Sequence, residues 1–130
     1  MSEWTGGCLC GTVRYRLGSE PFDAGWCHCR MCQLNSGSPA MAFASIPIAD
    51  FQITAGKDRV RRFKSSDFGW RMFCSACGTP LGMHVDYEPK LLDFSIATLD
   101  DPERLPPEFH IFYSSRIAWA PAADTLTRHN

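Results

Sequence analysis

Apolar and polar residues alternate along four segments of the chain, which is the pattern of half-buried β-strands. The alternating segments are Thr12–Leu17, Leu81–Tyr87, Leu91–Ile96 and Phe109–Tyr113. In the third of these, the alternation places Leu92 and Phe94 inward. It places Asp93 and Ser95 on the outward face.

Further strands with less regular faces are expected between glycine and proline residues, which punctuate the whole chain. They are Ala40–Ile46, Phe51–Thr54, Arg59–Lys64 and Arg71–Cys74. One helix is expected, from about Cys29 to Ser36, with Gly37 as its C-terminal stop. Many short strands with turns between them predict an all-β domain of antiparallel sheets, with at most one short helical turn.

Length and composition place the chain among globular proteins. Its 130 residues suit a single domain spanning 1–130, and 45% hydrophobic against 21% charged residues argues against disorder. No apolar run is long enough to cross a membrane, and the first residues do not resemble a secretion signal, so a cytoplasmic location is expected. The net charge of −1 argues against a nucleic-acid partner.

Seven cysteines are the unusual feature of the composition. An odd number leaves a thiol over in any fully paired disulfide framework, and clustered thiols in a reducing compartment point first to metal binding. They fall in three motifs: Cys8-Leu9-Cys10, Cys27-His28-Cys29-Arg30-Met31-Cys32 and Cys74-Ser75-Ala76-Cys77-Gly78.

The spacing of these motifs suits tetrahedral zinc when the backbone bends. Thiolates on one zinc ion lie just under ~4 Å apart, whereas alternate residues of an extended strand are separated by roughly 6.6 Å. A bend is therefore required at Cys8 and Cys10, and Gly11 permits one. Gly78 follows the third motif, where a left-handed glycine is expected.

Seven sulfurs divide most simply into four and three. A closed structural site uses four ligands, and a catalytic zinc site keeps three and leaves one position open for a soft ligand such as a substrate thiolate. Spacing alone leaves other divisions open, including a ribbon of Cys29, Cys32, Cys74 and Cys77. Buried free thiols and a thiol–disulfide redox role are further interpretations.

The motifs, taken together, resemble the glutathione-dependent formaldehyde-activating enzyme family, which includes the centromere protein V type. The resemblance is carried by Gly7–Val13, by Cys27–Gln33 with Ser36–Pro39, and by Arg71–Gly78. Its C-terminal part is carried by Leu99–Pro102, Pro107, His110–Phe112 and Trp119. All seven cysteines fall on the motifs, and the resemblance extends from about Trp4 to Leu126.

This resemblance implies an all-β, Mss4-like β-tent held together by zinc. It assigns a structural zinc to Cys8, Cys10, Cys74 and Cys77, and a second, catalytic zinc to Cys27, Cys29 and Cys32. It implies a carbon–sulfur lyase that adds glutathione or a similar small thiol to formaldehyde or another small aldehyde. The rival hypothesis is a non-catalytic, zinc-stabilised binding module.

Four residues are candidates for contact with substrate: Trp26, His28, Arg71 and His110. Trp26 is adjacent to Cys27, and His28 lies inside the second motif. The remaining tryptophans, Trp4, Trp70 and Trp119, are expected in the core or in pocket walls. His84 and His129 are expected in solvent, the latter in a loose tail.

Overall fold

The computed structural model describes residues 3–130, and Met1 and Ser2, which the sequence assigns to the domain, lie outside the described residues. The strands are β1 (Trp4–Gly7), β2 (Arg14–Leu17), β3 (Phe22–Cys27), β4 (Met41–Pro47), β5 (Phe51–Ala55), β6 (Val60–Ser66), β7 (Gly69–Cys74), β8 (Pro80–Val85), β9 (Leu91–Ser95), β10 (Phe109–Ile111) and β11 (Thr127–Arg128). The α-helix α1 spans Arg30–Ser36. Single 3₁₀ turns occupy Ile48–Asp50, Lys57–Arg59, Ile96–Thr98, Pro102–Arg104 and Tyr113–Ser115. None of the helices in residues 3–130 has the length and apolar character of a membrane span.

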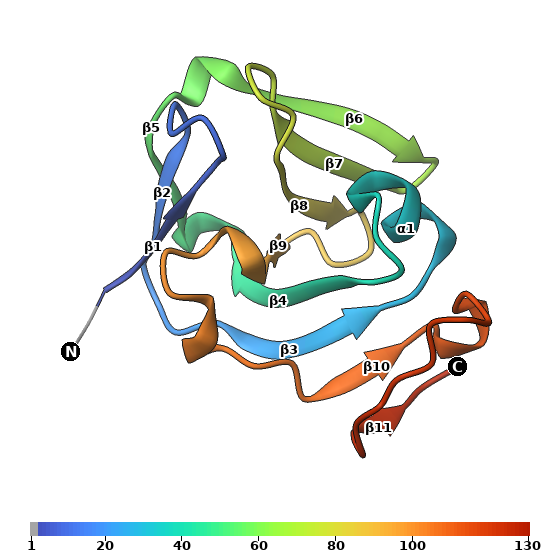
Figure 1. Ribbon diagram of the computed structural model, residues 1–130. Helices are drawn as coiled ribbons and strands as arrows, with labels where there is room; N and C mark the ends of the chain where they lie inside the picture. The colour runs from blue at the N-terminus through green and yellow to red at the C-terminus, as the bar shows by residue number, and fades with distance from the viewer. Residues whose placement is uncertain (1–2) are drawn as a thin grey trace.

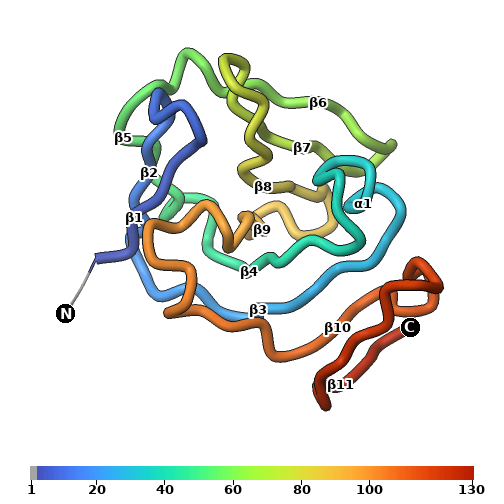
Figure 2. The backbone as a smooth tube through the Cα atoms, viewed as in Figure 1, coloured from blue at the N-terminus to red at the C-terminus, as the bar shows by residue number. Residues whose placement is uncertain are grey.

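The strands form two sheets. A small sheet has the order β1-β2-β5, and a large one has the order β11-β10-β3-β4-β9-β8-β7-β6. The large sheet curls so that β6 and β7 face β3 across an open end, and α1 lies at that opening (Figures 1 and 2). This curvature brings residues from distant parts of the chain to one hollow, where the candidate site is found.

The predicted all-β class is confirmed, with one correction to the strand directions. Most neighbouring strands are antiparallel, but β10 runs parallel to both β3 and β11. The chain reaches β10 by a long path over the molecule after β9, and this crossover allows it to join β3 in the parallel sense. The tail after β10 is therefore not loose, because the His129 N–H donates to the His110 carbonyl across 2.8 Å.

The predicted helix is confirmed together with both of its ends. Cys29 is the N-cap, and its sulfur accepts a hydrogen bond from the Cys32 N–H. Gly37 ends the helix in the left-handed conformation at φ 67° and donates to the Gln33 carbonyl. The second cysteine motif therefore forms the N-cap and the first turn of α1.

The main core lies between the two sheets. Tyr15 of the small sheet stacks on Phe51 at 4.5 Å between ring centroids and meets Phe94 of the large sheet edge-on. Leu92 and Phe94 are buried as the alternation of β9 predicts. The prediction for the opposite face of β9 is wrong at Ser95, which is only 7% exposed, because this face turns toward the hollow of the curled sheet instead of solvent.

Candidate functional site

The seven sulfurs gather into one group of four and one of three. Within each group all the sulfur atoms lie within 4.8 Å of one another; the groups are Cys8, Cys10, Cys74 and Cys77, and Cys27, Cys29 and Cys32. The alternative ribbon that mixes Cys29 and Cys32 with Cys74 and Cys77 is wrong, because the fold holds these pairs in separate groups. All seven cysteines are free thiols.

The four-sulfur group joins the loop after β1 to the loop after β7. Cys8 Sγ lies 3.6 Å from Cys10 Sγ, and Cys10 Sγ lies 4.0 Å from Cys74 Sγ. These separations match the ~4 Å spacing of thiolates around tetrahedral zinc. Gly11 and Gly78 make the required bends at φ 79° and 82°. Four thiolates at tetrahedral spacing therefore fit a closed zinc site.

Hydroxyl groups adjoin two of these sulfurs. Thr79 Oγ1 lies 3.2 Å from Cys77 Sγ, and hydrogen bonding from Thr79 lowers the pKa of Cys77 to about 5. Thr12 Oγ1 lies 3.2 Å from Cys10 Sγ, and it lowers the pKa of that thiol in the same way. Both contacts favour the thiolate form, which is the form that binds metal.

The three-sulfur group lies where β3 passes into α1. Cys27 ends the strand, Cys29 caps the helix, and Cys32 is in its first turn. Hydrogen bonding with the neighbouring Cys27 and Cys32 thiols lowers the pKa of Cys29. Among residues 3–130, no carboxylate, histidine nitrogen or further sulfur completes this group as a fourth metal ligand. Three thiolates without a fourth protein ligand fit a zinc site with an open position.

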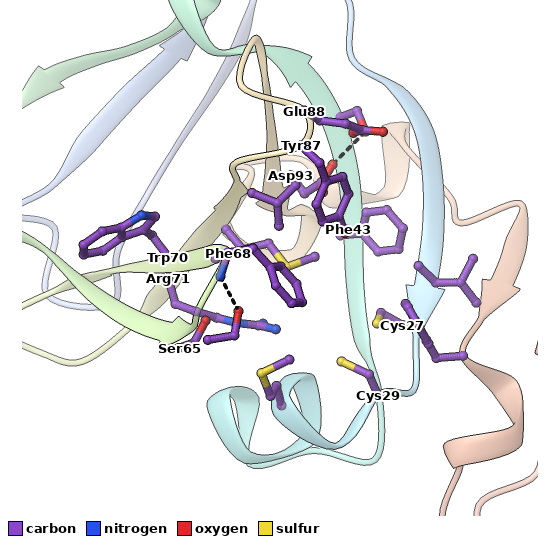
Figure 3. A pocket seen from close by; sticks show the side chains of 18 of the residues that line it. Cys27, Cys29, Phe43, Ser65, Phe68, Trp70, Arg71, Tyr87, Glu88 and Asp93 are labelled. Carbon is purple, nitrogen blue, oxygen red and sulfur yellow. Dashed lines mark hydrogen bonds between the residues drawn. The ribbon is translucent and has the colours of Figure 1, made fainter.

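A cavity of about 490 Å³ opens beside the three-sulfur group. Cys27 and Cys29 are among its lining residues, and Cys32 is not. Cys29 is the partly exposed member of the group, and Cys27 and Cys32 are both fully buried. Figure 3 shows both lining sulfurs at one end of the cavity, close to α1. The walls come from α1 and from β3, β4, β6, β7, β8, β9 and β10, and are mainly aromatic and aliphatic.

Arg71 carries a positive charge into this cavity from β7. Its side chain is only 5% exposed, and its Nη1 donates to Cys32 Sγ across 3.4 Å. No other hydrogen bond joins its guanidinium to a residue of the 3–130 region, although a guanidinium has five N–H donors. The structure thus brings this predicted residue to the cavity, and the role in substrate binding stays a prediction.

Carboxylates lie at the opposite end of the cavity from the cysteines. Asp93 and Glu88 are labelled there in Figure 3, and Asp23 also lines the cavity. Burial raises the pKa of Asp93, and a 2.8 Å hydrogen bond from the Ser45 hydroxyl acts in the opposite direction. The sequence prediction missed these residues, because separated acids in a chain carry no signal until the sheet curls.

His28 and His110 meet each other but do not line the cavity. The Asp124 carboxylate accepts a hydrogen bond from His110 Nε2 at 3.1 Å, and a 2.9 Å hydrogen bond joins His110 Nδ1 to His28 Nε2. Both histidines are buried, and burial lowers the pKa of His28. These hydrogen bonds tie the cysteine loop to the C-terminal segment, and neither predicted histidine lines the cavity.

The tryptophans divide between the two environments. Trp70 lines the cavity, and Trp4 packs against the main core. Trp26 is not among the cavity-lining residues, because successive residues of a strand point to opposite faces and Cys27 takes the cavity side. The expectation for Trp119 is wrong, since its side chain is 75% exposed. His84 is half-buried, and its Nε2 pairs with the Pro89 carbonyl.

Comparison with known proteins identifies the relatives of this chain. The model of the family described as glutathione-dependent formaldehyde-activating enzyme matches residues 3–115. An uncharacterized lyase of Schizosaccharomyces pombe is 33% identical over 81 residues, which are 62% of this chain and 57% of the yeast protein. A putative glutathione-dependent formaldehyde-activating enzyme of Halomonas elongata is 27% identical over 121 residues, or 88% of this chain and 77% of that protein.

A crystal structure of a Rhodobacter sphaeroides protein has the same fold. It superposes with a TM-score of 0.62 at 21% identity, covering 74% of this chain and 87% of the other. The match over residues 3–115 spans all seven cysteines and the walls of the cavity. The chain belongs to the glutathione-dependent formaldehyde-activating enzyme family.

Proposed function

We propose that this protein is a zinc-dependent carbon–sulfur lyase that joins a small thiol, glutathione or a similar one, to a small aldehyde such as formaldehyde. The observation that supports it best is the three-sulfur group: two of its cysteines line a cavity, and no fourth protein ligand in residues 3–130 completes it. The lyase and formaldehyde-activating names of the relatives point in the same direction.

Two metal roles follow from the two sulfur groups. Zinc held by Cys8, Cys10, Cys74 and Cys77 would brace the junction of the two sheets. When bound by Cys27, Cys29 and Cys32, zinc would supply a Lewis acid with an open position, which lowers the pKa of an incoming thiol.

The reaction itself is an addition. A carbon–sulfur bond forms between the thiol sulfur and the aldehyde carbon, the carbonyl π-bond breaks, and the thiol proton ends on the oxygen. In the reverse direction the carbon–sulfur bond breaks and the proton returns to sulfur. No oxidant or reductant takes part.

The residues of the cavity contribute apolar contact and orientation. Phe43 and Phe109 meet edge to face at 6.1 Å and form an apolar wall next to the cysteines. Arg71 offers N–H donors to an anionic group of the thiol substrate, and its charge favours thiolates at the neighbouring sulfurs. Holding both reactants in one cavity lowers the entropic part of the barrier.

Activity of a Cys29→Ser variant tests this proposal. The zinc-loaded wild-type protein is expected to accelerate the condensation of glutathione with formaldehyde, followed by the loss of free thiol or by NMR. Cys29→Ser is expected to lose this activity while it keeps the fold. Leu9→Ser, at an exposed position between Cys8 and Cys10, is the control and retains activity.

The binding-module hypothesis makes the opposite prediction. Wild-type protein with both metals bound would then show no acceleration with any thiol and aldehyde tested. Activity that survives removal of metal from the three-sulfur group would also contradict the proposal.

A further inference from the structure

We propose that the acidic end of the cavity, formed by Asp23, Glu88 and Asp93, binds the ammonium group of the substrate, so that the enzyme selects amino-acid-type thiols that carry a free amine. This inference rests on the proposed function, because it names a chemical feature of the thiol that the same cavity accepts.

The charges of the cavity are unbalanced. Arg71 is the only Lys or Arg among the lining residues, against three carboxylates. None of the three carboxylates forms an ion pair with a residue in the 3–130 region. Asp93 is half-buried, and Asp23 and Glu88 are exposed. Carboxylates without a charged partner at one end of a cavity attract a cation from outside the chain.

Asp93 is the best placed of the three. It stands on β9 with its side chain toward the hollow, and its single hydrogen bond comes from Ser45. Ser95 lies on the same face of that strand, is 7% exposed, and its hydroxyl has no hydrogen-bond partner. Ser95 is buried without lining the cavity, so the unused bonding capacity at the cavity wall is that of Asp93.

Aromatic side chains line the same cavity as the carboxylates. Figure 3 shows Tyr87 and Phe43 beside Asp93, and Phe68 lies 5.7 Å from Tyr87 between ring centroids. Aromatic faces together with carboxylates are the chemistry that recognises an ammonium group, because the ring quadrupole and the negative charge both attract a cation. A neutral or purely anionic substrate would gain nothing from this arrangement.

Arg71 gives independent evidence that a charged molecule occupies the cavity. Its side chain is only 5% exposed, and it reaches into the cavity in Figure 3. One of its N–H groups donates to Cys32 Sγ. Its free donors suit a carboxylate. A ligand with one carboxylate near Arg71 and one ammonium near Asp93 satisfies both ends, and an amino-acid-type thiol has both groups.

Backbone geometry supports a ligand role for Asp23. Among residues 3–130, the only non-glycine residues with positive φ are Asp23 and Phe112, both at 52°, and both line this cavity. Asp23 stands at the irregularity of register between β3 and β4. Left-handed backbone at a non-glycine residue costs free energy and is concentrated at functional sites.

Binding of two thioethers tests the proposal apart from the thiol chemistry. S-methylglutathione keeps the amine but has no ionisable thiol, and its N-acetyl derivative lacks the ammonium charge. By isothermal titration, wild-type protein is expected to bind S-methylglutathione at least about tenfold more tightly than the N-acetyl derivative, the size of a charge-assisted hydrogen bond.

Matched variants locate the effect. Asp93→Asn is expected to abolish most of the difference between the two ligands, and Asp23→Asn to reduce it, since asparagine tolerates the left-handed backbone. Asp86→Asn is the control, because Asp86 is exposed and does not line the cavity. It should keep the full discrimination.

The outcomes separate this inference from the proposed function. Equal affinity for the two thioethers, or no measurable binding of either, overturns the ammonium site even if glutathione and formaldehyde are turned over. Discrimination that depends on Asp93, in a protein without turnover, supports the ammonium site and counts against the lyase.

Discussion

The cavity is lined by charged residues that the sequence pattern alone would place on an ordinary surface. Arg71 is one of the four substrate-contact candidates in the sequence, and the curled sheet brings it to Cys32 of the second cysteine motif. Asp93 was expected in solvent, and it faces the cavity. Alternation along a strand gives two faces, but it does not tell which of them closes over a hollow.

The shape of the Arg71 side chain is predicted to matter as well as its charge. Arg71→Lys keeps the positive charge but loses the planar guanidinium. In the wild type, one N–H of this group donates to Cys32, and its other N–H groups can donate to substrate. We expect kcat/KM for the thiol to fall about tenfold or more, measured by steady-state kinetics. Arg59→Lys, at an exposed position, should change it little. Equal kcat/KM values for the two variants would show that Arg71 does not contact the thiol substrate.

Removal of the Asp93 charge is predicted to stabilise the fold. Because burial raises the folded pKa of Asp93 above its ordinary value of 3.8, the folded state holds a proton that the unfolded chain has lost. The free energy of unfolding therefore falls as the pH rises from 3.8 through the folded pKa of Asp93. Asp93→Asn has no carboxyl group to ionise, so its stability does not fall in this way. We expect a higher Tm for the variant at pH 7.5, and a smaller difference at pH 5. A lower Tm at both values would contradict this account.

The elements were predictable where the hydrophobic pattern was regular. The alternation of apolar and polar residues predicted the buried faces of β2 and β9. Cys29 and Gly37 marked the two ends of α1. The strands β1, β3 and β11 were not predicted. Two glycines occupy β1, β3 contains Asp23 and Gly25, and β11 has two residues, so none shows a period of two. Long-range pairing, not local propensity, makes them strands.

Glycines in the cysteine loops are predicted to support the metal sites. A methyl group at Gly78 or at Gly37 would meet nothing within 4 Å, so alanine there costs only the left-handed backbone, about 1 kcal/mol in the free energy of unfolding. Urea denaturation measures this cost. Gly78→Ala should also speed the release of zinc from the four-sulfur group to a chelator, and Gly37→Ala should not. Equal release rates would argue against the bend at Gly78 as part of that site.

For the whole molecule, the four-sulfur group connects segments that lie far apart in the chain. Zinc in such a group contributes ~10–16 kcal/mol of apparent binding energy, against a total stability of ~5–15 kcal/mol. We expect Cys77→Ser to lose cooperative thermal unfolding and most amide protection. Cys29→Ser should keep both. A well-folded Cys77→Ser protein would show that the main core suffices without the metal.

The arrangement of the sheets explains why the sequence predicted the metal groups better than the cavity. Cysteine spacing and the family resemblance indicated the division into four and three sulfurs, which the structure has. The cavity depends on the curvature of the large sheet and on the parallel strand β10, and neither leaves a local signal. Of the four candidates for substrate contact, Trp26, His28, Arg71 and His110, only Arg71 therefore lines the cavity.

The central claim is that one sulfur group closes around its metal and the other leaves a position open to a thiol. Zinc counting during titration with glutathione and then with a strong chelator tests it most directly. The account predicts two zinc ions per chain, one that is sensitive to glutathione and released to the chelator while the fold persists, and one released only on unfolding. A single zinc per chain, or two that leave together with the fold, would contradict it.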